Sequence, residues 1–389
     1  MPSPDPSTTA KQNLTFEERR VLRLLPNHTY DEIVQQTGWS RGRIYNLAIK
    51  VGARKTEARI QERHEQRRQR QVEFLNEVIN TTAKCDVLDF LDGLPTNSVQ
   101  FHLTSFPYNL GKPYGDSPTA DNMRFTFYLG WTLQIISEIS RTLAPGATLC
   151  LNLGSTRDWQ DRLMPLDIIL FDFIRQAGLT FQSRIIWVLP HGLTPKRRLA
   201  ERHETILVFS KGEQQTFNPN AVRVPQKEPG KRAYKGPNKG RLSGHPFGAF
   251  PSNVWHIPHV GHNSKDLQYL KHLKSPAKHP APFPIALARR AILLYSMPGD
   301  LVCDVFSGSG TANLAAIETG RAFVGSDLFY TSTRQARLAN AVPDHVCELP
   351  GVTDESIAVW QAEAVKIQNP APHITHEQET AMIQRAFRY

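Results

Sequence analysis

Short apolar runs alternate with amphipathic stretches through the middle and the last third of the chain. The apolar runs have the length of buried strands, and they lie at 85–88, 98–103, 147–154, 184–190, 205–212, 301–306 and 321–328. The amphipathic stretches repeat apolar residues at helical spacing, and they lie at 125–141, 165–178, 285–296 and 312–320. This alternation predicts an α/β fold, in which helices cover both faces of a mostly parallel sheet.

The first part of the chain carries helical signals of a different kind. A polar segment at 1–12 predicts a disordered tail, and residues 13–58 predict a small all-α domain of three helices. The pattern Thr-x-x-Glu, typical of a capping box at a helix start, occurs at 15–18 and again at 29–32. Ser40 is the expected N-cap of the third helix.

The second and third of these helices are joined by a turn that contains Gly38, as in a helix-turn-helix module. Such modules contact DNA from the start of their second helix, so Arg41, Arg43 and Asn46 are the candidate DNA-binding residues. A three-helix module that binds another protein is the alternative. Residues 59–80 are rich in charged residues and predict an exposed helix that links two domains.

Composition narrows the class of protein. The 389 residues suggest two or three domains, and a net charge of +10 favours a polyanionic partner. The cysteines are far apart with no CxxC pair, which argues against a metal site or a disulfide framework and fits a reducing cytoplasm. No apolar run approaches the ~20 residues that a membrane span requires, and the first residues lack a secretory signal. The chain is therefore expected in the cytoplasm, bound to no membrane.

Two loops carry the candidate chemistry. The first, at 104–108, reads Thr-Ser-Phe-Pro-Tyr and follows an apolar run, and loops in this position line the ligand crevice of an open α/β sheet. The second, at 304–311, reads Asp-Val-Phe-Ser-Gly-Ser-Gly-Thr and also follows an apolar run. Gly308 and Gly310 permit a tight turn and close approach of a ligand, and the helix that follows favours an anionic group at its start.

A glycine loop alone also fits a nucleotide-phosphate site. The pyrophosphate pattern G-x-G-x-x-G is absent, however, and Asp327 ends the next apolar run, where a carboxylate can accept the two hydroxyls of a ribose. Phe306 can pack against the same ligand.

The order of the two loops resembles the permuted, or beta-group, DNA amino-methyltransferases, in which the catalytic loop precedes the glycine loop. The resemblance covers roughly residues 81–340. It implies a Rossmann-like methyltransferase sheet, S-adenosylmethionine as cofactor and double-stranded DNA as partner. It also implies a catalytic half at 81–212, a target-recognition region at 213–275 and a cofactor-binding half at 276–345. The remaining residues, 346–389, are expected to form a peripheral helix and tail.

The resemblance assigns roles within the first loop. An exocyclic base amine is a poor nucleophile, and acceptors for its hydrogens improve it; the Ser105 side chain and the carbonyl of Phe106 would supply them. Tyr108, held by Pro107, would stack on a base flipped out of the duplex. The family usually has Pro where this chain has Phe106. Ser105 at the first position suggests the N4 amine of cytosine, whereas enzymes that act on the N6 amine of adenine usually carry Asp there.

The same resemblance assigns Asp86, His279 and Asp304, with Phe306, Gly308, Gly310 and Asp327, to the cofactor pocket. The middle region holds basic residues among many Gly and Pro, and the candidates for DNA contact are Lys231, Arg232, Lys235 and Arg241. A disordered basic linker is the alternative. The Arg-His-Glu segment at 202–204 recurs in the family near the pocket, and His203 is either part of the pocket or a structural histidine.

Three other functions were weighed. Methylation of cytosine at carbon 5 needs a cysteine nucleophile, typically after proline, and none of the cysteines follows proline. A helix-turn-helix regulator with an inactive methyltransferase body is disfavoured by the intact loops. Protein-glutamine methyltransferases place the glycine loop first, opposite to the order here. A cognate restriction endonuclease is an open partner, since the sequence does not distinguish a solitary methyltransferase from a paired one.

Overall fold

The computed structural model describes residues 15–25, 28, 30–50, 57–115, 121–190, 195–213, 215–228, 230–245, 248–261, 264–272, 279–339 and 341–342. The tail expected at 1–12 and the helix and tail expected at 346–389 lie outside these residues. The chain forms two compact units, Met1–Asn76 and Glu77–Tyr389.

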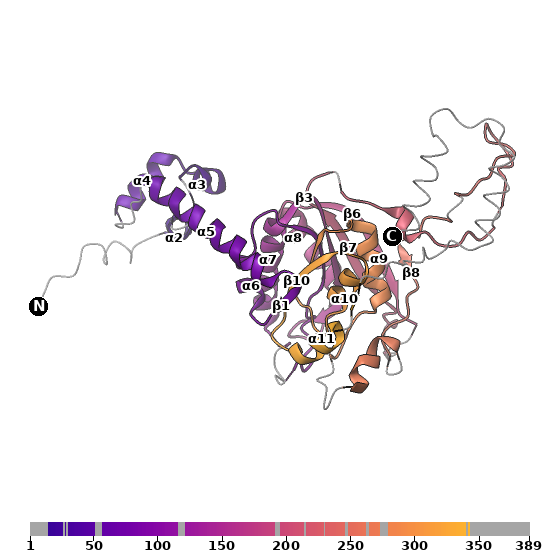
Figure 1. The fold of residues 1–389 in the computed structure, drawn as a ribbon. Helices are drawn as coiled ribbons and strands as arrows, with labels where there is room; N and C mark the ends of the chain where they lie inside the picture. The colour runs from indigo at the N-terminus through magenta and orange to yellow at the C-terminus, as the bar shows by residue number, and fades with distance from the viewer. Residues whose placement is uncertain are drawn as a thin grey trace, which may run out of the picture. The chain divides into compact units, whose positions relative to one another are not determined.

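The first unit is helical, as predicted. Its helices, shown in Figure 1, are α2 (Phe16–Leu24), α3 (Tyr30–Thr37), α4 (Arg41–Lys50) and the first part of α5 (Glu57–Val78). The capping box at the start of α2 is confirmed: the Glu18 amide donates to Thr15 Oγ1 at 3.2 Å, and the Thr15 amide donates to Glu18 Oε2 at 2.8 Å. The second capping box depends on Thr29, which lies outside the described residues.

The predicted turn between α3 and α4 is also present. Gly38 has a φ of +70°, a conformation that glycine adopts without strain, and Ser40 Oγ accepts from the Arg43 amide at 3.3 Å at the start of α4. The helices pack around a small apolar core that includes Val21, Ile33 and Ile44. In this unit a glycine turn thus joins α3 to α4, and the helix-turn-helix module stays a prediction.

The second unit contains an eight-stranded sheet in the order β1-β10-β9-β2-β3-β7-β6-β8. Its strands are β1 (Thr81–Ala83), β2 (Val99–Ser105), β3 (Leu143–Leu153), β6 (Thr180–Val188), β7 (His203–Ser210), β8 (Val254–Trp255), β9 (Leu301–Asp304) and β10 (Ala322–Ser326). Neighbouring strands are parallel except at β3–β7 and β7–β6. The prediction of a mostly parallel sheet is confirmed.

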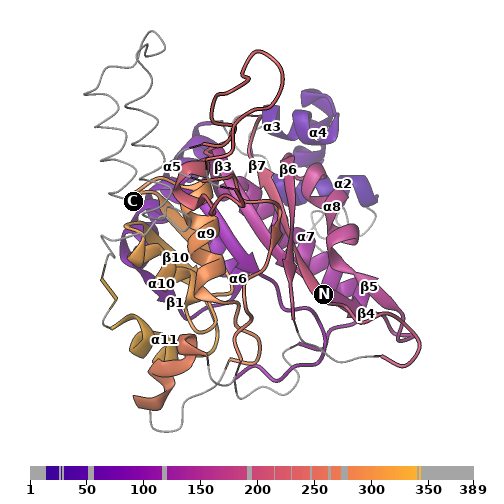
Figure 2. The same ribbon diagram turned by 90° about the vertical axis from the view of Figure 1, so that its right-hand side faces the viewer.

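Helices cover both faces of the sheet, as Figures 1 and 2 show. One face carries α6 (Val87–Gly93), α7 (Phe125–Thr142) and α8 (Leu166–Gln176), and the other carries α9 (Ile285–Tyr295) and α10 (Thr311–Glu318). The smaller elements are the hairpin of β4 (Ser155–Arg157) and β5 (Leu163–Pro165), the 3-10 helices η1 (Pro219–Val222) and η2 (Lys265–His272), and α11 (Thr331–Leu338). No helix among the described residues is long and apolar enough to cross a membrane.

One predicted strand is wrong. The apolar residues at 85–88 were expected to form a strand, but α6 begins at Val87, and Asp86 is its N-cap, with Oδ1 accepting from the Leu88 amide at 2.8 Å. An aspartate that satisfies a free amide of the first turn favours a helix start over a strand. The strand in this region is the three-residue β1, Thr81–Ala83, which pairs with β10.

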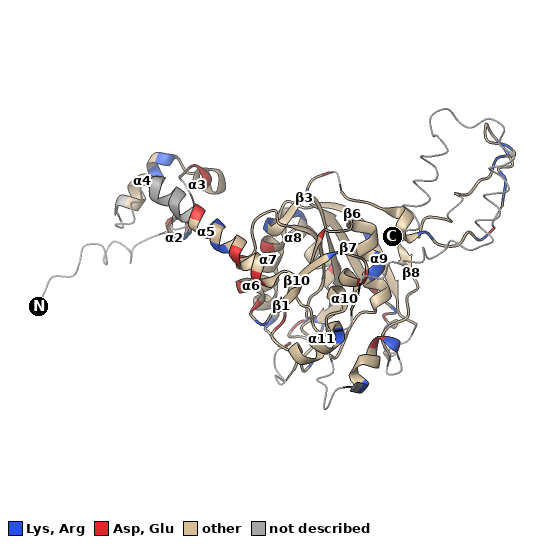
Figure 3. Ribbon diagram, in the orientation of Figure 1, with Lys and Arg blue, Asp and Glu red and all other residues tan. Residues whose placement is uncertain are grey.

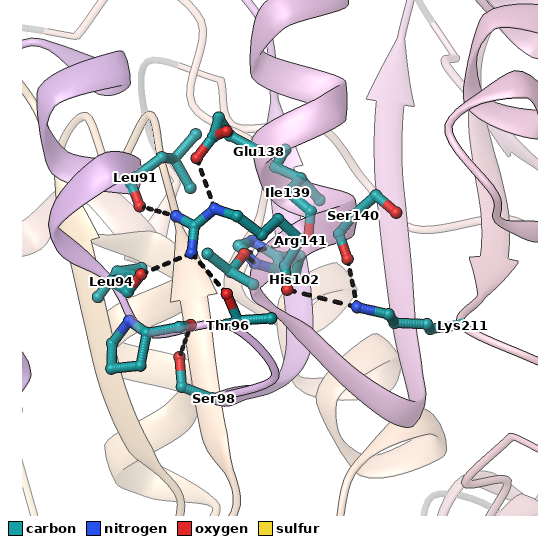
Figure 4. A network of polar contacts seen from close by, with 12 residues as sticks. Leu91, Leu94, Thr96, Ser98, His102, Glu138, Ile139, Ser140, Arg141 and Lys211 are labelled. Atoms are coloured by element: carbon teal, nitrogen blue, oxygen red, sulfur yellow. Dashed lines mark hydrogen bonds and ion pairs between the residues drawn. The ribbon is translucent and has the colours of Figure 1, made fainter. Parts of the chain in front are cut away.

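A polar network fixes the carboxyl end of α7 (Figure 4). Arg141 donates to the Leu94 carbonyl at 2.9 Å and to Glu138 at 2.8 Å, so it joins the end of α6 to α7. The Lys211 ammonium donates to the carbonyls of Ser140 and Leu143 at 2.7 and 2.8 Å. These bonds satisfy carbonyls that a helix end leaves free, and they anchor α7 at the sheet edge opposite the candidate site.

Candidate active site

The candidate loops meet because of the strand directions. The strands β2, β9 and β10 are parallel, so their carboxyl ends lie at one edge of the sheet, next to that of β3. Ser105 at the end of β2 pairs with Asn152 of β3. The antiparallel strand β7 begins at this edge, which brings Glu204 beside them. Residues from distant parts of the sequence therefore surround one crevice, as expected for an open α/β sheet.

A cavity of about 570 Å³ opens at this edge. The predicted residues that line it are Asp86, Ser105, Phe106, Pro107, Tyr108, His279, Phe306, Gly308 and Asp327. Both candidate loops thus face one space, whose volume is typical of a small-molecule site. Asp304 and Gly310 lie behind the lining residues, and Asp304 is only 1% exposed.

A hydrogen-bonded network lies at the end of the cavity that the Ser105 loop lines. Ser105 Oγ donates to Tyr108 Oη at 3.3 Å, and Tyr108 Oη donates to Glu204 Oε2 at 3.0 Å. The Asn152 side-chain amide lies 2.6 Å from Glu204 Oε2 and 3.0 Å from Tyr108 Oη. Burial and the nearby Glu204 carboxylate raise the pKa of Tyr108 well above its ordinary value, so the phenol stays protonated.

Two members of this network, Asn152 and Glu204, were not predicted from the sequence. His203, the neighbour that was singled out, is exposed at the start of β7 and does not line the cavity. Asn152 could have been identified as a candidate because it is a polar residue inside the apolar run Leu-Cys-Leu-Asn-Leu. Glu204 belongs to the Arg-His-Glu segment that the resemblance places near the pocket, but the candidate considered in that segment is His203 and not Glu204.

Aromatic packing shapes the wall beside this network. The ring of Tyr108 packs on Gly154, where a Cβ atom would come within 2.7 Å of it, and the side chain lines the cavity from there. Phe106 is 2% exposed, and its ring lies 5.4 Å from that of Phe306 in an edge-to-face contact. Trp131 of α7 contacts Phe306 from another side, with 5.6 Å between ring centroids. The departure from the family pattern at Phe106 therefore joins the two loops through an aromatic contact.

The glycine loop is tied to the end of β10. Gly308 has a φ of +48°, and its amide donates to Asp327 Oδ2 at 2.8 Å. The other oxygen, Oδ1, accepts from the Phe329 amide at 2.7 Å. Burial raises the pKa of Asp327, against the lowering effect of these two amides. The carboxylate is thus held in place while it faces the cavity.

Two arginines of α11 hold the loop from behind, and neither was predicted. Arg334 donates to the Gly308 carbonyl at 2.6 Å, and Arg337 donates to the hydroxyls of Ser309 and Thr311 at 3.1 and 2.8 Å. Both arginines are almost fully buried. Their charge balances nearby carboxylates and the loop carbonyls, and their hydrogen bonds attach the glycine loop to α11.

Burial strongly shifts the pKa values of two other predicted cofactor residues, His279 and Asp304. Burial lowers the pKa of His279 to about 4, helped by the charges of Lys112 and Arg337, so its ring is neutral at physiological pH. A Cβ atom at Gly308 would come within 2.6 Å of its Nε2 atom, so the ring packs directly on the glycine loop. Burial also raises the pKa of Asp304 to about 7, and its Oδ1 atom accepts from the Phe306 amide at 3.1 Å.

The predicted DNA-binding residues lie on surfaces of the two units. Arg41, Arg43 and Asn46 are exposed on α4; Arg41 pairs with Asp31 at 3.2 Å, and Arg43 lies over the Trp39 ring. In the second unit, the exposed candidates are Lys231, Arg232, Lys235 and Arg241. Figure 3 shows cations along the loop between β7 and β8 that carries them. A bridge between Arg232 and Leu242 gives this loop local order, which the alternative of a disordered linker does not predict.

The fold and the paired loops define a class, the α/β methyltransferases with the catalytic loop ahead of the glycine loop. Residues 99–336 match the model of the family described as DNA methylase, and the chain belongs to this N6/N4 DNA methylase family. The protein is accordingly a DNA methyltransferase. Membership of this family confirms the predicted S-adenosylmethionine cofactor and makes DNA the substrate.

Several known proteins are similar to the chain. The Type II methyltransferase M.BglII of Bacillus subtilis is 34% identical over 255 residues, which cover 66% of this chain and 67% of the relative. The DNA adenine methyltransferase YhdJ of Escherichia coli (strain K12) is 29% identical over 245 residues, which cover 62% and 76%. The solved structure of PvuII DNA methyltransferase (cytosine-N4-specific) has a TM-score of 0.50 at 20% identity, and covers 79% of this chain and 92% of that one. This last similarity supports the fold.

The residues present fit the cofactor. The Asp327 carboxylate faces the cavity at the end of β10, where it can accept from ribose hydroxyls. The Phe306 ring provides an apolar wall, and the residues Ser309 and Thr311 line the cavity at the start of α10. A helix start favours an anionic group such as the carboxylate of the cofactor.

Proposed function

We propose that the protein transfers a methyl group from S-adenosylmethionine to the exocyclic N4 amine of cytosine in double-stranded DNA. The observation that carries this choice is the hydroxyl of Ser105 at the first position of the catalytic loop, and its bond to Tyr108 Oη. Because the hydrogen of this hydroxyl is directed at Tyr108, a lone pair of Ser105 Oγ is left to accept a hydrogen of the amine.

The chain's own residues prepare the amine for attack. Ser105 Oγ and the carbonyl of Phe106 accept its two hydrogens, which draws the lone pair of the nitrogen out of conjugation with the ring. The bound cofactor supplies an electrophilic methyl group attached to a sulfonium. The site also holds the amine in line with that methyl group. Positioning of this kind can supply a large part of the decrease in activation free energy that an enzyme produces.

The base reaches this cavity only after leaving the duplex, because a stacked and paired base hides its amine. Tyr108 supports one face of the flipped base, and Gly154 supports the other side of the Tyr108 ring. This arrangement places the ring edge, with its hydroxyl, toward Ser105 and Glu204.

The local charge favours cytosine chemistry over adenine chemistry. The enzymes that act on adenine usually carry Asp in place of Ser105. A carboxylate at that position here would lie close to Glu204, which is one hydrogen-bonded residue away through Tyr108. Two carboxylates that face the same phenol repel each other. The hydroxyl of Ser105 avoids this conflict, and we infer that the site has been shaped for cytosine.

DNA recognition is divided between two regions in this proposal. The loop that carries Lys231, Arg232, Lys235 and Arg241 belongs to the same unit as the catalytic cavity, and it selects the sequence. The helical unit adds affinity through Arg41, Arg43 and Asn46. Several relatives are Type II methyltransferases, which supports a role in restriction-modification, with a cognate restriction endonuclease as the functional counterpart.

The test is to identify the modified nucleoside. Plasmid DNA is incubated with the purified protein and S-adenosylmethionine, digested to nucleosides and analysed by mass spectrometry. N4-methylcytosine is the expected product. N6-methyladenine as the only product would refute the choice of cytosine. It would mean that an enzyme with serine at the first position of this loop can act on adenine.

A further inference from the structure

We propose that Glu204 is the terminal proton acceptor of the methyl transfer, reached through a relay formed by Ser105 and Tyr108. This inference rests on the proposed methylation of an exocyclic amine and assigns the proton that the reaction must release. It is carried by the direction of the hydrogen bonds at the end of the cavity.

The donors and acceptors of this network run one way. The Ser105 hydroxyl donates to Tyr108 at 3.3 Å, and Tyr108 donates to Glu204 at 3.0 Å. An ionised carboxylate can only accept, so it fixes the direction of both bonds. The Asn152 amide also donates to Glu204 Oε2, at 2.6 Å, and holds that oxygen in place without being able to take a proton from it.

The proton has to leave because an amine nitrogen that gains a methyl group becomes positively charged. In the proposed step, the bond from nitrogen to the methyl carbon forms as the bond from that carbon to sulfur breaks, and the sulfonium becomes a neutral thioether. One N–H bond then breaks, and its proton moves to Ser105 Oγ. The original Ser105 proton moves to Tyr108 Oη, and the Tyr108 proton moves to Glu204. The net result is that the nitrogen gains one methyl group and loses one proton, which ends on Glu204.

A carboxylate is the required end point of this chain. Serine and tyrosine do not keep an additional proton near neutral pH, so they can pass a proton on but not store it. Burial and Glu204 raise the pKa of Tyr108, which keeps the phenol protonated between turnovers and ready to relay. Among the residues that the structure describes, Glu204 is the one carboxylate bonded to this network. Its side chain is partly exposed, so the proton can afterwards pass to water.

Other charged groups face the same cavity and bear on any pH dependence. They are Asp86, Lys112, His259, His279 and Asp327 from neighbouring elements, together with the phenol of Tyr114, whose pKa is raised by burial, with a contribution from Glu204. None of these groups takes part in the hydrogen bonds that join Ser105 to Tyr108 and Tyr108 to Glu204. A variant of Glu204 therefore separates the relay from the titration of the remaining groups.

The test compares Glu204→Gln with the wild-type protein in single-turnover methylation at saturating DNA and S-adenosylmethionine, over a range of pH. Glutamine keeps the shape and can still accept from Tyr108 and Asn152, but it cannot take the proton. General bases typically contribute 10²–10⁴-fold, so a loss of about 100-fold or more is expected. The dependence of the rate on pH should differ between the wild-type protein and the variant. Dissociation constants for S-adenosylmethionine and DNA should stay unchanged.

Two further variants give the matched controls. Glu201→Gln removes an exposed carboxylate three positions earlier, which bonds Ser155 at 2.6 Å outside the cavity, and it should leave the rate unchanged. Glu204→Asp retains a carboxylate base and should restore part of the lost rate. These comparisons require only that each variant binds the cofactor, which calorimetry establishes.

A double-mutant cycle decides between a relay and a structural role. Tyr108→Phe keeps the ring that supports the base and removes both relay bonds. If Tyr108 and Glu204 serve one proton path, the double variant should lose no more rate than the more damaged single variant. Additive losses, an unchanged pH profile in Glu204→Gln, or a loss confined to DNA affinity would each overturn the relay. Wild-type methylation of adenine would overturn only the choice of cytosine, because the cycle uses whichever base is modified.

Discussion

The buried carboxyl of Asp304 makes folding stability depend on pH in an unusual direction. Burial raises its pKa from the ordinary 3.8 to about 7, against the lowering effect of the Thr104 hydroxyl and the Phe306 amide. The folded protein therefore holds this proton more tightly than the unfolded chain. The stability that the group contributes is fully present below pH ~4 and is lost as the pH rises toward 7.

The perturbation is Asp304→Asn, which keeps an oxygen for the Phe306 amide and removes the titration. At ~1.4 kcal/mol for each pKa unit, the wild-type protein should lose about 2.5 kcal/mol more between pH ~5 and pH ~8 than the variant does. Other titrating groups, Asp327 among them, are present in both proteins. The difference between the two proteins at two pH values therefore isolates Asp304, whatever the substitution costs at a single pH.

The assay is urea unfolding followed by tryptophan fluorescence, at both pH values and for both proteins. The midpoint of the variant relative to the wild type should move to higher urea as the pH is raised, at constant slope. A difference that does not change with pH would refute the reasoning, and so would one that changes in the opposite direction. An unchanged difference would mean that Asp304 is ionised in the folded protein across this range.

Three further predictions concern the ligands. Asp327→Ala should weaken S-adenosylmethionine binding about tenfold or more in calorimetry, since unpaired buried partners cost ~1–3 kcal/mol; an unchanged constant would place the ribose elsewhere. Tyr108→Ala should lose ~1–3 kcal/mol of stacking on a flipped base, measured as DNA affinity, while cofactor affinity stays unchanged; lost cofactor binding would contradict the assignment. Removing residues 1–76 should weaken DNA binding and flatten its salt dependence, with the methylated sequence retained; a relaxed sequence would show that the helical unit reads bases.

The parts of the site that follow from local sequence could be predicted. The loop with Ser105 and Tyr108 and the loop with Gly308 each lie directly after an apolar strand, and both face the cavity. Strand direction then determines the edge at which they meet. An apolar run followed by a loop motif is a local pattern, and recognising it does not require the order of the strands in the sheet.

Glu204 shows where such prediction stops. It is 96 positions from Tyr108 in the sequence, and their contact depends on β7 running antiparallel beside β3. Nothing within the segment around Glu204 specifies that pairing, because a buried strand has the same composition in either direction. Arg334 and Arg337 could not be predicted for the same reason. They belong to a polar helix, α11, and its sequence does not indicate that these two side chains are buried against the glycine loop.

The strand wrongly expected at 85–88 has a different cause. Val87 and Leu88 are compatible with either structure, and short apolar runs do not distinguish a strand from a helix start. Asp86 decides the outcome through its bond to the Leu88 amide, a capping signal that outweighs the preference of two apolar residues. The functional consequence is small, since Asp86 lines the cavity from the helix start.

The central claim is transfer of a methyl group to the N4 amine of cytosine, and one measurement tests it most directly. Duplex DNA is methylated with S-adenosylmethionine that carries an isotope-labelled methyl group, digested to nucleosides and separated before mass spectrometry. We expect the label in N4-methylcytosine, and Glu204→Gln should slow the appearance of this nucleoside without changing its identity. Label found only in N6-methyladenine would contradict the account.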